Sequence, residues 1–180
     1  MRLILSGLLM FVLPSLVNAQ TLKADAMKAA TVLADRLVIS TDKYTAVVTQ
    51  FNMVDKSMVS LKTRYTNIKG KMSEFDKTLA DILLDSMIKG QDAQYKLIRT
   101  GGGQPDGPVM KKLKQAKQLL DDGTSAYNGE MYLKAITAYT SGSLEAGTGN
   151  KMIDKSAAEI TKTNNLAIGL DKVLKFYEGE

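Results

Sequence analysis

The sequence YTAVVTQFNMVDKSMVSLKTRYTNIKGKMSEFDKTLADI (residues 44–82) carries the strongest pattern in this chain of 180 residues. Apolar or aromatic residues recur along it in alternating steps of three and four, without a slip. The twelve positions are Tyr44, Val47, Phe51, Val54, Met58, Leu61, Tyr65, Ile68, Met72, Phe75, Leu79 and Ile82. This spacing places one apolar stripe along a helix, and it is typical of a coiled coil or a long helical bundle.

Toward the N-terminus the same frame is interrupted only at Ser40. Its earlier members are Leu37, Leu33, Ala30 and Ala26. Residues 40–42 are Ser, Thr and Asp, which cap helices readily, so we expect a kink or break there. Gly70 is the other possible turn, but Met72 and Phe75 keep the frame beyond it. The sequence therefore favours one continuous helix across Gly70.

The C-terminal half also reads as helical. After Ile82 the frame fails, and Lys89 followed by Gly90 is typical of a helix end. Residues 100–108 hold four glycines and two prolines and predict a loop. Pro108 should open a helix that ends at Gly123 or at Gly129. A second helix is expected over residues 131–141, a break over 147–150 and a last helix over 151–177.

A helix with a single apolar stripe is not stable alone and needs a partner. We therefore expect an all-α fold: an elongated helical bundle built on one long N-terminal coiled-coil-like helix, with a small helical hairpin and a C-terminal helix. The predicted organisation is a signal peptide over 1–19, a heptad region over 20–99, the Gly/Pro loop over 100–108, and a helical region over 109–180 that packs on the long helix.

The first nineteen residues have the pattern of a secretory signal. Arg2 gives a positive start, a mostly apolar run follows from Leu3 to Val17, and small residues precede Gln20. Cleavage is predicted after Ala19, with export to the periplasm or the medium; an uncleaved anchor is the alternative. Because no later apolar run is long enough to span a bilayer, the mature chain is expected to lack a transmembrane segment.

Composition narrows the chemistry. Cysteine, histidine and tryptophan are absent, which removes the commonest nucleophile, general base and metal ligands. The net charge is +5, and loss of Arg2 with the signal would leave +4, too little for a dedicated nucleic-acid binder. We therefore expect no enzyme activity, no cofactor, no metal and no nucleic-acid partner.

One stretch, residues 123–142, resembles a tetratricopeptide repeat. The residues that match the family's spacing are Gly123, Tyr127, Tyr132, Ala135, Ile136, Tyr139 and Gly142. Gly129 stands one residue early, and Asp122 replaces the usual leucine. The resemblance implies a helical hairpin with a groove for a peptide or small ligand, although solenoid repeats need neighbours and no second copy is present. An ordinary helical hairpin is the alternative.

The order of segments also resembles that of the minor pilus-tip subunits of type IV secretion systems, which are exported helical proteins without enzyme activity. The likeness is one of architecture, since no motif matches residue by residue.

Two groups of side chains are the candidate interaction residues. The basic group on the long helix is Lys62, Arg64, Lys69 and Lys71, and the aromatic group on the hairpin is Tyr127, Tyr132 and Tyr139. The main hypothesis is a structural or assembly component, for example of a secretion or envelope apparatus, that binds protein partners, with self-association included. The alternative is a peptide- or ligand-binding module that uses the hairpin.

Overall fold

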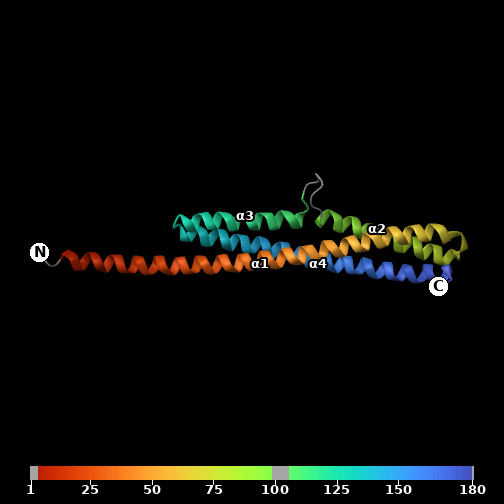
Figure 1. Ribbon diagram of the computed structural model, residues 1–180, viewed down its shortest axis with the longest axis horizontal. Coiled ribbons are helices and arrows are strands. Elements are labelled where there is room, and N and C mark those ends of the chain that lie inside the picture. The colour runs from red at the N-terminus through yellow and green to blue at the C-terminus, as the bar shows by residue number, and fades with distance from the viewer. Residues whose placement is uncertain (1–3, 99–105, 180) are drawn as a thin grey trace. The chain divides into compact units, whose positions relative to one another are not determined.

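A computed structural model describes the backbone of residues 4–98 and 106–179 and the side chains of residues 18–98 and 106–179. Within these ranges the chain forms four helices, one short 3₁₀ turn and no strand, which confirms the all-α prediction (Figure 1). The elements are α1 (Ile4–Ile68), η1 (Lys69–Lys71), α2 (Glu74–Ile98), α3 (Pro108–Asn128) and α4 (Tyr132–Glu178). Residues 99–105, most of the predicted loop, and the side chains of residues 1–17 in the predicted signal lie outside the described residues.

The chain divides into two compact units. Unit 1 contains α1 as far as Ser40, α3 from Lys112 and α4 as far as Thr148. Unit 2 contains α1 from Thr41, all of α2 and α4 from Gly149. In each unit α1 and α4 run in the same direction and the third helix runs against them (Figure 1). Each unit is therefore a three-helix bundle that buries the stripe of α1.

The core of unit 1 is built largely from small side chains. One cluster of its buried side chains consists of Ala26, Leu33, Ala116, Ala126, Ala135, Tyr139 and Ala146. Two glycines bring the helices closer still. A Cβ on Gly123 would lie 2.5 Å from Cε1 of Tyr139, and one on Gly142 would lie 2.6 Å from Cδ2 of Leu33. The absence of these side chains is thus what lets the helices meet.

The core of unit 2 uses larger side chains. One cluster of its buried side chains consists of Leu61, Tyr65, Ile68, Met72, Ala80, Leu84, Met87, Ala167, Leu170 and Leu174. Polar contacts join the end of α4 to the turn between α1 and α2. Tyr177 Oη donates to Asp76 Oδ2 at 2.5 Å and accepts from the Ser73 N–H at 3.2 Å. The C-terminal end of α4 is thereby attached to the start of α2.

The predicted stripe is confirmed along α1 as far as Ile68. Every position of the frame from Ala26 to Ile68 is buried or half-buried. The expected break at residues 40–42 is wrong, because α1 is uninterrupted there. Ser40 is fully buried, and its hydroxyl donates to the Arg36 carbonyl at 2.6 Å. A serine that bonds within its own helix can occupy a core position without an unsatisfied polar group.

The prediction of a continuous helix across Gly70 is also wrong. α1 ends at Ile68, and α2 begins after Ser73, whose Oγ accepts from the Asp76 N–H at 3.1 Å as an N-cap. The new helix does not keep the frame, so Phe75 is 76% exposed and Ile82 is 58% exposed. Met72 is still buried because it precedes the cap.

Two further boundaries differ from the prediction. α2 continues through Lys89 and Gly90 to Ile98. Gly90 is not a helix end but a close contact with Thr163, where a Cβ would lie 2.7 Å from Oγ1. The expected break at residues 147–150 is absent, and the two helices predicted on either side of it are the single helix α4. The start of α3 at Pro108 is confirmed, and the helix takes the longer of its two expected lengths.

Substitution of two glycines by alanine should have opposite effects on stability. Gly123→Ala forces the Tyr139 ring to move and should lower the free energy of unfolding by about 1–3 kcal/mol. Gly169→Ala, the matched control within α4, has nothing within 4 Å of the added Cβ and should raise it by about 0.5–1 kcal/mol. Urea unfolding followed by circular dichroism measures both. Equal changes in the two variants would contradict the close approach at Gly123.

Candidate functional site

Arg64, one of the predicted interaction residues, is bound within unit 2. Its Nε donates to Glu178 Oε1 at 2.9 Å and its Nη1 to Asp171 Oδ1 at 2.5 Å, while Nη2 pairs with Glu178. These hydrogen bonds lower the pKa of Asp171 and of Glu178 and raise the pKa of Arg64. Arg64 therefore attaches the C-terminal end of α4 to α1.

Lys69 also has partners within the unit. Its Nζ lies 3.5 Å from Asp81 Oδ2 and 5.1 Å from the centroid of the Tyr65 ring, and Tyr65 Oη donates to Asp81 Oδ1 at 2.8 Å. The hydrogen bond with Tyr65 raises the pKa of Lys69. Lys62 and Lys71 are exposed. The structure thus uses two of the four predicted basic residues to join helices.

The three predicted tyrosines do not form one groove. Tyr139 is buried in the core of unit 1, with its ring against Gly123 and its hydroxyl 3.4 Å from Thr124 Oγ1. Tyr127 and Tyr132 are half-buried and stack edge to face at the turn between α3 and α4, with centroids 5.5 Å apart. The aromatic pair therefore supports the turn from outside the core.

The turn itself holds a strained residue. The Met131 N–H donates to the Ala126 carbonyl at 2.9 Å, and the Glu130 N–H donates to the Tyr127 carbonyl at 3.0 Å. This pair of bonds is a Schellman motif, whose left-handed position is usually glycine. Here that position is Glu130, with φ 58°. Gly129, which stands one residue early for a tetratricopeptide repeat, also stands one residue before Glu130, the left-handed position at which a glycine would be unstrained.

The hairpin expected from the tetratricopeptide resemblance is present, but it does not form a repeat unit. α4 has 47 residues, whereas a whole repeat has about 34. A single helix longer than a repeat cannot stack in such an array. The geometry therefore favours the ordinary helical hairpin.

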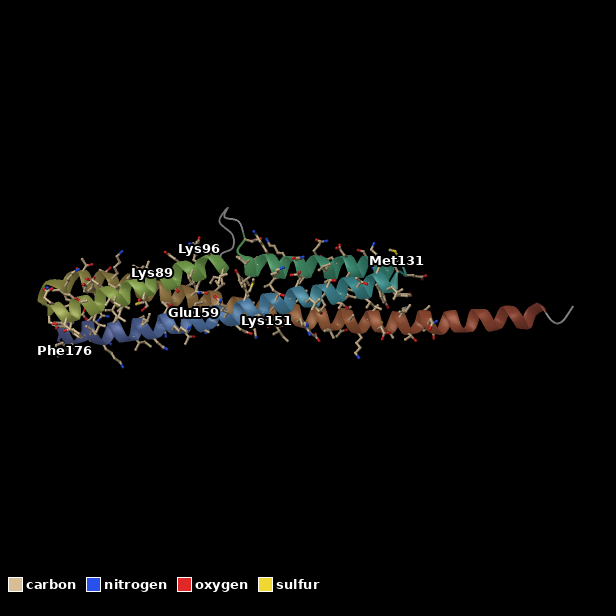
Figure 2. All side chains as sticks on the ribbon, turned by 180° about the vertical axis from the view of Figure 1, so that it is seen from behind. Lys89, Lys96, Met131, Lys151, Glu159 and Phe176 are labelled. Atoms are coloured by element: carbon tan, nitrogen blue, oxygen red, sulfur yellow. The ribbon has the colours of Figure 1, made fainter. Side chains whose placement is uncertain are left out.

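An apolar groove of about 690 Å³ lies beside this turn. The groove is lined by Asn18, Ala19, Leu22, Glu130, Met131, Tyr132, Leu133 and Lys134, and we call the surface formed by these residues the tip surface. Leu133 is 66% exposed, and Met131 projects from the turn (Figure 2). Sequence reasoning missed Met131 and Leu133. The available signal was two large apolar residues directly after a glycine turn, flanking the inward-facing Tyr132.

No family model, curated protein or solved structure matches this chain significantly. Among the described helices, none combines the length and apolarity needed to cross a membrane.

Replacement of the strained residue should stabilise the protein. Glu130→Gly removes the left-handed strain and should raise the free energy of unfolding by about 0.5–1 kcal/mol after the entropy of glycine is counted. Glu130→Ala is the control, because it removes the charge but keeps the strain. A gain in both variants, measured by urea unfolding, would show that the carboxylate and not the backbone is responsible.

The Arg64 cluster should make stability depend on acid pH. The pKa values of Asp171 and Glu178 are lowered in the folded state, so their contribution is present above the ordinary values of about 4 and is lost as pH falls through the lowered ones. Arg64→Met should cost about 1 kcal/mol at neutral pH, since solvent screens this partly exposed cluster.

The difference between Arg64→Met and the native chain should shrink below pH 4. The matched control is Lys62→Met, which alters an exposed side chain on the same helix and should have little effect. Unfolding in urea at several pH values measures both. A difference that stays constant with pH would contradict the charge-based explanation.

Proposed function

We propose that this protein is an exported component of an envelope or secretion assembly, and that it works by binding a protein partner at the tip surface. The observation that carries the proposal is the coincidence of a strained backbone at Glu130 with exposed Met131 and Leu133 on the rim of an apolar groove. Backbone strain retained in a turn that glycine would relax is a feature of functional segments.

The chemistry of the tip surface suits a protein ligand. Tyrosine is one of the residue types that carry binding energy in protein interfaces, and methionine is enriched in interface cores. Methionine also adapts its shape to a partner. The open groove, bordered by Glu130 and Lys134, combines an apolar centre with charges of both signs at its edge. This arrangement fits an apolar side chain or a helix end of another protein.

Export would enlarge this surface. The predicted cleavage after Ala19 removes Asn18 and Ala19 from the groove and leaves Leu22. The mature N-terminus at Gln20 would then lie next to the binding rim. The absence of cysteine and histidine supports binding in preference to catalysis.

Site-specific photo-crosslinking tests the proposal. A benzoylphenylalanine at position 133 should give a crosslinked protein adduct in the exported fraction of the native cell. Leu144 is the matched control, because it is on the same helix and in the same unit and is 68% exposed, against 66% for Leu133. Met131→Lys should weaken the adduct at position 133 at least tenfold, since a charge would enter the apolar rim.

Two outcomes would contradict the proposal. Equal adducts from positions 133 and 144 would show that the tip surface has no special role. A chain found only in the cytoplasmic fraction, with residues 1–19 still attached, would refute the export part.

A further inference from the structure

A second surface, in unit 2, has an unusual composition. Two adjoining hollows of about 320 and 230 Å³ lie between α1 and α4, and both are bordered by Asn164. We call this surface the neutral groove. Between its ends it is lined by Gln50, Met53, Val54, Ser57, Ser60, Leu61, Ile160, Thr161, Asn164, Ala167 and Ile168.

Apart from Arg64 and Asp171, which line one end and pair with each other, no side chain in the lining of the two hollows is charged, although 24% of the residues in the chain are. Two ion pairs cross from α1 to α4 near the groove. Lys43 Nζ lies 2.9 Å from Asp154 Oδ1 beyond the Gln50 end, and Arg64 binds Asp171 at the other end. These four charges are therefore compensated inside the unit.

The neutral groove also has both projecting and small side chains, as a contact between packed helices requires. Met53 on α1 is 59% exposed and Ile168 on α4 is 48% exposed, so each side contributes an apolar projection. Ser57 and Ser60 are small, which permits another backbone to come close. Met53 can adapt its rotamer to whatever packs on it.

We propose that the neutral groove binds the neutral groove of a second copy of this chain, related by a two-fold axis with the helices antiparallel. In a two-fold contact the same patch serves both partners, so it must be self-complementary. A patch without net charge meets this condition, because no like charges are brought together. The compensated pairs at the Lys43 end of one copy would meet those at the Arg64 end of the other.

The size of the surface limits the strength of the contact. From Gln50 to Arg64 the lined part of the groove extends about 21 Å along α1, and two helices side by side are roughly 20 Å wide. The buried area is then roughly 400 Å² on each copy, or about 800 Å² in all, below the range for stable specific interfaces. We therefore expect a weak, reversible dimer and not an obligate one. The inference goes beyond the proposed function, which concerns the tip surface and a different protein partner.

Sedimentation equilibrium of the purified exported protein, over about 1–300 µM, tests the dimer. The native chain should change from monomer to dimer with concentration. Met53→Lys should weaken dimerisation at least tenfold, because a lysine charge would be buried against its own counterpart. Ile82→Lys is the matched control: Ile82 is 58% exposed but lies on α2, outside the groove, and its substitution should leave the dimer unchanged.

A native chain that stays monomeric over the whole range would overturn the inference, as would self-association that the two variants weaken equally. Circular dichroism at a concentration where the native chain is monomeric should show that both lysine variants keep the native melting temperature, since neither site is buried within one copy. The mass of the adduct at position 133 separates the two proposals. A monomeric chain that still crosslinks to another protein there refutes the dimer alone, whereas a dimer without that adduct refutes the tip surface alone.

Discussion

The apolar stripe of α1 is the constraint on which the rest of the structure depends. From Ala26 to Ile68 it presents a buried or half-buried side chain at every third or fourth residue, and no helix of that kind is stable in water without cover. In each unit α4 runs alongside α1 in the same direction. The chain between two parallel helices has to return, and it does so as α2 in unit 2 and as α3 in unit 1. The fold thus follows from the need to cover one stripe on two sides.

The sequence was sufficient to predict this stripe as far as Ile68. Beyond Ile68 it predicted the wrong inward face of α2, and the reason is physical. The residues that α2 turns inward are Ala80, Leu84, Met87, Gln91, Gln94 and Ile98. Two of these are glutamines, whereas the predicted frame at the start of α2, Phe75, Leu79 and Ile82, is wholly apolar. A count of apolar residues over residues 75–82 therefore selects the wrong face. The Ser73 cap, which sets the true start of α2, is a local signal that a long periodic pattern hides.

The buried glutamines can be understood from their partners. Gln91 Nε2 donates to the Phe51 carbonyl at 3.2 Å, and Ser156 Oγ donates to Gln94 Oε1 at 2.8 Å. These bonds tie α2 to α1 and to α4 at fixed positions. An apolar stripe permits helices to slide by a turn, whereas a buried polar contact does not, because sliding would leave its atoms unsatisfied. The polar residues thus give unit 2 a defined register that hydrophobic burial alone would not supply.

At the candidate sites, too, the residues that stand out in the sequence differ from those that the structure leaves exposed for binding. Arg64, Lys69 and Tyr139 attract attention in a sequence because their chemistry is strong, and strong interactions are also what holds helices together. Once these side chains have their hydrogen-bond and ion-pair partners inside a unit, they have few donors or acceptors left to bind another protein. The surfaces that remain unsatisfied are apolar and neutral, such as the rim at Leu133 and the groove at Met53. A sequence cannot distinguish these from core residues, because only the packing decides which side of a helix faces solvent.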